Sequence, residues 1–388
     1  MSSTPAGLPK YRWTILAAGV VAQASFSAIF FGLPALAPTV RAQYDLSLPE
    51  VGLVLASLNI GLLSTLLLWG IVADRIGERA VLSVGLTGCG IALVVTAATS
   101  SLAGLVVTLV AAGALGGGTQ TASGRAVMSW FGPEERGLAL GIRQTAVPLG
   151  GAIAAVALPA LAQHADLDAA FLALAAGCIA AAVVCAVLIR REPSADLAHP
   201  GRPLRDPRIW RLCFGSTFYV ATQISLLGFL VLFLHDEHGV SATAGAAALA
   251  VTQAFGGVAR IGVGRWSDQR RERIVPMLRL GLLLAASAFV VALLLNASLW
   301  LLVPALVVAG TCSLAWNGLS FTATAEIAGR SRAGSAIGLQ QSFLAAGSIV
   351  APILFSTLVH ATSWRLAFLL AAMSPLVGYI LLSPLAER

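Results

Sequence analysis

Charged residues are scarce in this sequence. Only 11% of its 388 residues are Asp, Glu, Lys or Arg, whereas 58% are hydrophobic. Soluble domains carry about 25% charged residues, so this composition does not suit a surface that faces water on all sides. Long runs have no charge at all, and about 20 apolar residues suffice to cross the hydrocarbon core of a bilayer. The composition therefore predicts a membrane protein that crosses the bilayer many times.

The charge-free runs predict twelve membrane spans and hence an all-α polytopic fold. Eight runs are each long enough for one helix: 13–40, 51–73, 144–165, 169–189, 212–235, 239–259, 333–364 and 366–386. Runs 80–124 and 280–325 are each long enough for two helices. The first run is too long for the core of a signal peptide, so we expect it to stay in the protein as a helix.

The residues needed for metal, disulfide or enzyme chemistry are sparse and scattered. The five cysteines lie singly inside spans with no paired ligand spacing, and we expect them to pack as small apolar side chains. The five histidines fall in loops or at span ends, and the chain has no nucleotide-binding loop. We therefore expect no enzyme activity, no cofactor and no metal.

The net charge of +7 is distributed in a way that favours a membrane over nucleic acid. Under twelve alternating spans nearly all the loop Lys and Arg residues fall on one side, and only Arg41 and Arg365 fall on the other. Cationic loops stay in the cytoplasm, so both termini are predicted to be cytoplasmic in an inner (plasma) membrane. A nucleic-acid surface would need aromatic residues among the basic ones on a soluble face, and a chain built of membrane spans has no such face.

One polar segment divides the chain into two similar halves. The sequence predicts that residues 190–211 form a cytoplasmic linker. It would join a six-helix bundle at 1–189 to a second six-helix bundle at 212–388. A shift of 197 residues superposes 136–154 on 333–351 and repeats four polar or glycine positions. These are Gly137, Gly141, Gln144 and Gly150. Two six-helix halves in parallel repeat are typical of transporters whose site lies between the halves.

The segment "GIVADRIGER" at 70–79 places four charges between the second and third spans. It resembles the loop signature of the major facilitator superfamily, and a degraded copy occurs at 264–273. "WFGPEERGLALG" at 130–141 is also similar to this family. Glu78 departs from the basic residue usual at its place. The resemblance covers the whole chain and implies two pseudo-symmetric six-helix bundles that transport by alternating access.

The loop signature is expected to act as a latch that closes the cytoplasmic side. Gly70 would allow close helix approach, and Gly77 would permit a tight turn. Asp74 would face the positive N-terminus of the helix that begins near Gly334, as the family arrangement implies. Arg75 and Arg79 would pair with acidic residues of the loop between the fourth and fifth spans, and Asp268 repeats Asp74 in the second half. Those acidic residues are Glu134 and Glu135.

Three arginines interrupt the spans: Arg125, Arg143 and Arg260. Each costs about 2.5–3.5 kcal/mol near the bilayer centre on insertion scales. No Asp or Glu lies deep inside any span, so the sequence predicts a cationic cavity in which an anionic solute supplies the missing partner. Arginine suits this role because its planar fork binds a carboxylate with two hydrogen bonds.

The segment "VARIGVGRWSD" at 258–268 resembles the eighth helix of oxalate and monocarboxylate carriers. The resemblance implies that Arg260 holds a substrate carboxylate. Nitrate carriers pair this arginine with one in the second helix, where this chain has Leu66.

Further polar or aromatic residues inside the spans complete a candidate cavity. Gln144 matches a substrate-contacting glutamine of sugar facilitators in its spacing, and Gln341 is its repeat mate. Tyr219 and Gln223 share a helix face at i and i+4. The other candidates are Gln23, Trp316, Asn317 and Gln340. Contact between helices is the alternative role for each of them.

The function favoured by these features is secondary transport of a small organic anion. Without an acid inside the spans, exchange for a counter-anion or co-transport with a proton fits better than antiport through a protein carboxylate. The alternatives are drug efflux, of whose fifth-helix pattern "VPLGGA" at 147–152 keeps only part, and a neutral-sugar carrier, favoured by Gln144. A non-transporting receptor would need neither the latch nor the repeat. We expect a monomer in a lipid bilayer.

Overall fold

The computed structural model describes residues 10–131, 136–190, 206–270, 272–329 and 333–386. Twelve helices or helix pairs in these ranges are long and apolar enough to cross a membrane, so the predicted number of spans is confirmed. The first six spans are α1 (Tyr11–Tyr44), α2 (Leu48–Ile76), α3 (Glu78–Ala97), α4 with α5 (Leu102–Gly116, Gly118–Trp130), α6 (Arg136–His164) and α7 (Leu167–Leu188). The last six are α8 (Pro207–His238), α9 (Ala242–Arg270), α10 (Ile274–Leu294), α11 with α12 (Leu299–Ala315, Asn317–Ala328), α13 (Ala333–Ala361) and α14 (Trp364–Leu382). A short 3-10 turn, η2 (Ser383–Leu385), follows.

Capping residues set where several spans begin. Ser47 and Glu50 form a capping box at the start of α2, which satisfies backbone N–H groups that the helix itself leaves unpaired. Asp206 caps α8 by accepting a hydrogen bond from the Arg208 N–H at 2.9 Å, and Pro207 supplies the first turn. Hydrogen bonding from the Arg208 side chain also lowers the pKa of Asp206. Helix α8 therefore begins inside the segment 190–211 that the sequence suggested as a linker.

Two spans are interrupted in mid-membrane. Gly117 separates α4 from α5, and Trp316 separates α11 from α12. The two interruptions occupy corresponding places in the two halves of the chain. Such breaks leave backbone carbonyls without helical partners, which is tolerated where other protein groups take them up.

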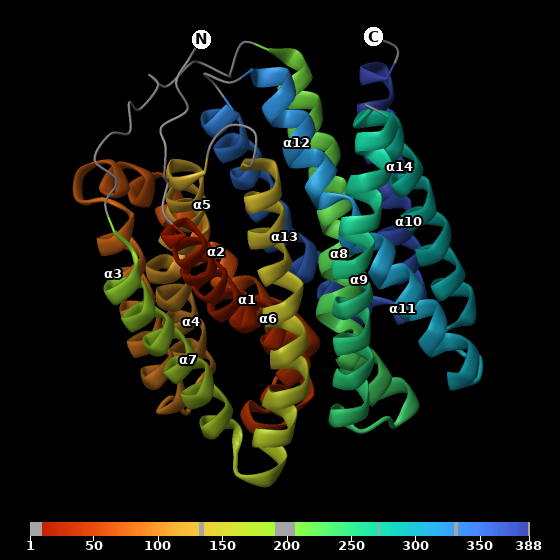
Figure 1. The fold of residues 1–388 in the computed structure, drawn as a ribbon. Coiled ribbons are helices and arrows are strands. Elements are labelled where there is room, and N and C mark those ends of the chain that lie inside the picture. The colour runs from red at the N-terminus through yellow and green to blue at the C-terminus, as the bar shows by residue number, and fades with distance from the viewer. Residues whose placement is uncertain (1–9, 132–135, 191–205, 271, 330–332, 387–388) are drawn as a thin grey trace, which may run out of the picture.

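The helices form two bundles of six spans. In the first bundle α1 packs on α6 and α7, α3 on α7 and α2 on α4, while in the second α14 packs on α8 and α10, and α9 on α11. Figure 1 shows α3, α4 and α7 at the outer edge of one bundle and α10, α11 and α14 at the outer edge of the other. The bundles meet through α2 with α13, α6 with α9 and α1 with α8.

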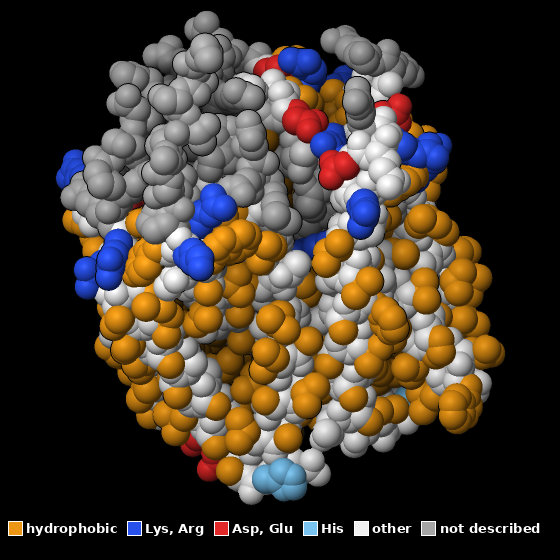
Figure 2. Space-filling model, viewed as in Figure 1, with side chains coloured by type: hydrophobic (Ala, Val, Ile, Leu, Met, Phe, Trp, Pro, Cys, Tyr) orange, Lys and Arg blue, Asp and Glu red, His pale blue; other side chains and the backbone are white. Residues whose placement is uncertain are grey.

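The surface is divided as a bilayer requires. Figure 2 shows a broad band of hydrophobic side chains on this face, with most of the visible Lys, Arg, Asp and Glu side chains gathered beyond one edge of it. All five cysteines are free, and four of them are buried as apolar packing residues would be. Twelve is an even number of spans, so α1 begins and α14 ends on the same side of the molecule. We call that side the terminal side and the opposite one the far side.

The bundles are sealed against each other on the far side. Arg41 of α1 forms an ion pair with Asp236 of α8. Thr243 Oγ1 of α9 donates a hydrogen bond to Gln163 Oε1 of α6 at 3.0 Å. Gly52 of α2 lies so close to α13 that a Cβ at this position would be 2.6 Å from the carbonyl oxygen of Pro352. Each of these contacts joins a helix of one bundle to a helix of the other.

The seam between α6 and α9 ends in mid-membrane. Toward the terminal side Gly257 lies against Pro148, where a Cβ on the glycine would lie 3.3 Å from the proline ring. Beyond it, a Cβ on Gly141 of α6 or Gly264 of α9 would meet no atom within 4 Å in the described part of the chain. A Cβ on Gly70 of α2 or Gly338 of α13 would also meet none, so among the described residues the bundles are apart at these positions and the structure opens toward the terminal side.

Candidate functional site

The three membrane arginines have three different environments. Arg143 of α6 is 6% exposed and is surrounded by acceptors of its own bundle. Its Nε donates to Ser123 Oγ at 2.9 Å, and one terminal nitrogen donates to Gln23 Oε1 at 2.7 Å and to the Gln120 carbonyl at 2.9 Å. The other terminal nitrogen lies 3.5 Å from Gln144 Oε1. Arg143 thus ties α1, α5 and α6 together.

Arg125 of α5 has an acidic partner. Its Nε lies 3.3 Å from Oε1 of Glu78, the first residue of α3. In this conformation a carboxylate from the neighbouring helix start is the partner of Arg125, and the role of Arg125 in substrate binding stays a prediction. The signal was present in the sequence: Glu78 replaces the basic residue usual in the loop signature, and its charge matches the arginine.

Arg260 of α9 is held at one edge of its guanidinium only. Its Nε donates to the carbonyl oxygen of Leu314 at 2.9 Å. This carbonyl lies at the end of α11, just before the interruption at Trp316, and it also accepts from Asn317 Nδ2 at 3.3 Å. Within the described part of the chain, no hydrogen bond or ion pair engages the two terminal nitrogens of Arg260. The broken span therefore orients the guanidinium and leaves its fork available.

Gln340 of α13 repeats the position of Arg143 at the shift of 197 residues, and its contacts repeat as well. Its Nε2 donates to Ser320 Oγ at 2.5 Å, as Arg143 Nε donates to Ser123, and Ser320 is the repeat mate of Ser123. Its Oε1 accepts from Thr324 Oγ1 at 2.9 Å. Gln340 is fully buried and joins α12 to α13. The serines were missed, although the same shift would have paired them.

Tyr219 and Trp316 lie in the core of the second bundle. Both are fully buried, and their rings meet edge to face at 5.6 Å. Tyr219 fits because Gly281 of α10 and Gly378 of α14 leave room for its ring, which a Cβ at either position would overlap. Neither side chain is accessible in this conformation, and their contact with substrate stays a prediction. Tyr219 was a candidate because it shares a helix face with Gln223, and its packing against α10 and α14 determines its place.

The remaining amides divide between paired and less constrained positions. Gln223 Oε1 of α8 accepts from Asn317 Nδ2 at 3.1 Å, which places this pair beside the carbonyl that holds Arg260. Gln23 Nε2 donates to Ser27 Oγ at 3.2 Å. Gln144 and its repeat mate Gln341 are both half-buried. Gln144 stands four residues before Pro148, so it extends the seam face of α6 into the part that has opened.

The loop signature has the turn that was expected but not the close approach. Gly77 has φ +81° and links α2 to α3. A Cβ on Gly70 would meet no atom within 4 Å in the described residues, so the close helix contact expected there is absent from this conformation. Helix α13 begins at Ala333, one residue before the expected Gly334. The side chain of Asp74 lies outside the described part of the structure, as do the residues at 134 and 135 to which Arg75 and Arg79 were expected to pair.

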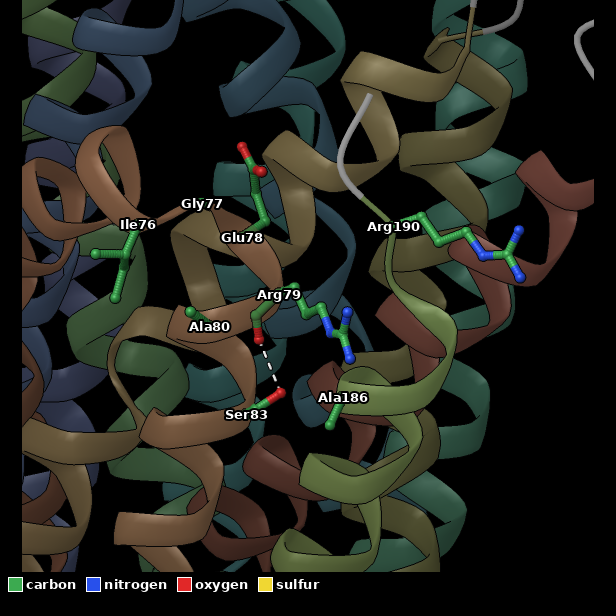
Figure 3. A pocket seen from close by; sticks show the side chains of 8 residues that line it. All are labelled: Ile76, Gly77, Glu78, Arg79, Ala80, Ser83, Ala186 and Arg190. Atoms are coloured by element: carbon green, nitrogen blue, oxygen red, sulfur yellow. Dashed lines mark hydrogen bonds between the residues drawn. The ribbon is translucent and has the colours of Figure 1, made fainter. Parts of the chain in front are cut away.

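Arg79 lines a recess in the first bundle. The recess is formed by the α2–α3 turn, the first residues of α3 and the end of α7. In Figure 3 the Arg79 side chain extends toward Ala186 of α7, whereas Glu78 points in a different direction. Ser83 Oγ donates to the Arg79 carbonyl at 2.8 Å. This recess lies at the α3–α7 edge of the first bundle, so it is separate from the site around Arg260 in the second.

Asp268, the counterpart of Asp74 in the repeat, forms contacts inside the second bundle. Its Oδ1 lies 2.5 Å from one terminal nitrogen of Arg273, and Arg273 Nε lies 3.0 Å from Oε1 of Glu326. Burial lowers the pKa of Arg273, but these hydrogen bonds outweigh it and raise the pKa overall. Asp268 thus links the ends of α9 and α12.

Comparison with known proteins agrees with this architecture. The chain is 32% identical over 398 residues to an uncharacterised MFS-type transporter of Mycobacterium tuberculosis, a match that covers 99% of this chain and 88% of the relative. A probable sulfoacetate transporter of Cupriavidus necator is 30% identical over 157 residues, or 40% of this chain and 36% of the relative. A hexuronate transporter of Bacillus subtilis is 27% identical over 117 residues, or 30% of this chain and 28% of the relative.

A solved structure has the same fold. It is the crystal structure of a bacterial homologue of the human lysosomal transporter Spinster, in an inward-facing and occupied conformation. The TM-score is 0.81 at 18% identity, and the superposition covers 100% of this chain and 98% of the other. The family model of the Major Facilitator Superfamily matches residues 15–344 and 276–388. With twelve spans in two bundles and a matching family model along nearly its whole length, the chain belongs to the major facilitator superfamily of transporters.

Proposed function

We propose that this transporter carries a small organic anion and that Arg260 is its principal anion contact. The observation that carries the proposal is the one-sided engagement of Arg260: Nε donates to the Leu314 carbonyl, and the terminal nitrogens have no partner in the described residues. Arg143 and Arg125 have protein acceptors, so their charges are balanced or solvated within the bundle. A guanidinium with a free fork selects carboxylate or sulfonate oxygens, which accept two parallel hydrogen bonds.

The partial relatives support the same chemistry. One is named for sulfoacetate and the other for hexuronate, and both of these solutes are organic acids. Polar neighbours of Arg260 suit a substrate that carries further oxygens, because Asn317 and Gln223 stand beside the same carbonyl. The coupled solute is a counter-anion or a proton that travels with the substrate, since the spans contain no deep acid.

The proposed cycle rocks the two bundles about this site. Residues 1–189 and 212–388 are the moving bodies, and the segment 190–211 lies on the cytoplasmic side together with both termini, in an inner (plasma) membrane. On this assignment the terminal side is cytoplasmic and the structure faces inward. Asp74, Arg75 and Arg79 form the latch that closes the terminal side when the far side opens. A monomer suffices, because both bundles come from one chain.

The test is ligand binding by purified wild type and by Arg260→Ala and Arg260→Lys. Thermal shifts and titrations would use sulfoacetate, glucuronate, glucose and tetraphenylphosphonium. Loss of a charge-assisted bidentate contact should cost about 2–5 kcal/mol, or roughly thirtyfold or more in affinity, in the alanine variant. Lysine keeps the charge without the fork, so it should recover only part of that loss. Esters of the acids should bind more weakly than the free acids.

The matched control is Arg265→Ala. Arg265 is exposed and lies five residues further along α9. Its replacement removes the same charge as Arg260→Ala and should change the affinity by less than about twofold. Melting temperatures of the ligand-free variants check the fold. Undiminished acid binding by Arg260→Ala would end the proposal. Tight binding of tetraphenylphosphonium by wild type, with no response to the acids, would indicate drug efflux instead.

A further inference from the structure

Gln253 is a buried amide whose polar atoms are both unpaired. The side chain of this α9 residue is fully buried, and neither Nε2 nor Oε1 has a hydrogen-bond partner in the described part of the structure. It faces α6, because a Cβ on Gly151 would lie 3.1 Å from Gln253 Nε2. The same Cβ would lie 2.9 Å from Phe31 of α1. A polar group in such a position calls for explanation, since native proteins pair nearly all of theirs.

The amide lies inside the seam that seals the bundles. The Gln163–Thr243 hydrogen bond lies on the far side of Gln253, and the Gly257–Pro148 contact lies on its terminal side. Gln253 is four residues from Gly257, so it is buried roughly 6 Å beyond the point where α6 and α9 part. Helices α6 and α9 belong to different bundles and are in contact, so a far-side opening that separates them at this point would expose Gln253.

Gln253 also shares a helix face with the anion contact. Gln253, Gly257 and Arg260 follow one another at i, i+4 and i+7, which places them on one stripe of α9. Gln144, Pro148 and Gly151 have the same spacing on α6 and face that stripe through the two contacts at the seam. Arg260 lies on the opened part of the stripe and Gln253 on the sealed part, roughly 10 Å apart along the axis.

We propose that Gln253 is a substrate contact of the far-side-open state, where its amide donates to the oxygens of the organic anion on its way to Arg260. When the seam closes, the bonds to the solute break and the amide is buried without partners. That burial penalises the sealed arrangement and so favours reopening toward the far side. The inference rests on the proposed function, since it takes the solute to be an organic anion.

The test uses Gln253→Met, which keeps the length of the side chain and removes both polar atoms. Apolar replacement of an unpaired buried group stabilises the state in which it is buried. With spin labels at cysteines in place of Ala165 and Ala244, in a background without the native cysteines, the ratio of short to long distances should rise at least about fivefold. This measurement is made in lipid nanodiscs without ligand.

The second measurement is the half-saturation for transport from each side. It uses membrane vesicles of both orientations and the acid, sulfoacetate or glucuronate, that wild type binds more tightly. If Gln253→Met only shifts the population, the apparent far-side affinity should weaken by the same factor as the population of the far-side-open state falls. Loss of a direct contact to a charged solute should weaken it by roughly a further tenfold or more. Terminal-side affinity should not weaken.

The matched control is Gln163→Met, the same change on the same seam. Gln163 is exposed and paired with Thr243, so its replacement removes a far-side contact and should lower, not raise, the short-distance fraction. The proposal requires both the population shift and the additional far-side loss in Gln253→Met. A distance distribution like that of wild type overturns it, and so does a far-side loss no larger than the population factor. If wild type binds neither acid, the proposed function fails first, which separates the two outcomes.

Discussion

An arginine in a membrane span is stable only if something accepts hydrogen bonds from it, and the partner determines its role. Arg143 donates hydrogen bonds to an amide, a hydroxyl and a backbone carbonyl, so removing it would leave several buried acceptors unpaired. Arg125 finds a carboxylate at the start of α3. Arg260 finds one carbonyl at a helix interruption. The first two therefore have acceptors within their own bundle, and we propose that the third holds the solute.

The Glu78–Arg125 pair should show energetic coupling. Both side chains are about three-quarters buried, at 22% and 25% exposure, so the pair is partly screened. We expect Glu78→Gln and Arg125→Gln each to lower thermal stability, and the double variant to lose less than the sum, with a coupling of about 1 kcal/mol. The measurement is a double-mutant cycle of melting temperature in one detergent. Strict additivity would refute the pairing, and acid binding by Arg125→Gln should stay within about twofold of wild type.

At the scale of helices, apolar run length predicted the spans because a bilayer requires about 20 apolar residues, whatever surrounds them. The ends were less predictable, because caps such as Asp206 and Pro207 extend α8 back into a charged segment. The interruption at Trp316 was not predicted, because Gly318, two residues beyond it, does not differ from the glycines that the continuous helices also contain, such as Gly310 of α11. The environment of Arg260 depends on that interruption, so sequence alone named the arginine without the carbonyl that orients it.

Close packing of α2 on α13 should hold the far side shut. A side chain at Gly52 would overlap Ser356 and Pro352 of α13, which a well-packed seam cannot absorb without moving a helix. Gly52→Val should therefore shift the bundles toward the far-side-open state, and the ratio of short to long distances between labels at Ala165 and Ala244 should fall roughly fivefold or more. Gly177→Val, where a Cβ would meet no atom within 4 Å in the described residues, is the control and should leave the ratio unchanged.

Asp74→Asn is the counterpart on the terminal side. If Asp74 closes that side by facing the N-terminus of α13, loss of its charge removes roughly 0.3–1 kcal/mol from the closed arrangement. The same labels should then report a modest increase in the short-distance population, opposite in sign to Gly52→Val, with slower transport and normal insertion. A ratio equal to that of wild type would leave Asp74 as a loop residue with no latch function.

At the scale of the whole molecule, the two sides differ in charge as well as in packing. Basic residues concentrate in the segments on the terminal side, whereas Arg41 and Arg365 belong to the far side, where Arg41 pairs with Asp236. An unpaired excess of Lys and Arg is retained in the cytoplasm during insertion. An arginine already matched by an acid at the opposite surface contributes little against that bias. The charge distribution and the ion pair therefore favour the same orientation.

Labelling from each side of the membrane tests that orientation. In a background without the native cysteines, Pro200→Cys places a thiol in the segment between the bundles, and Ala244→Cys places one at the exposed far-side start of α9. A membrane-impermeant maleimide should label the cysteine at 244 in intact cells and the one at 200 only after permeabilisation. Each variant serves as the accessibility control for the other. The reverse pattern would place the termini outside, and the open side of this structure would then face outward. Arg260 would in that case receive its anion from the exterior, and Gln253 would contact an anion that enters from the cytoplasm.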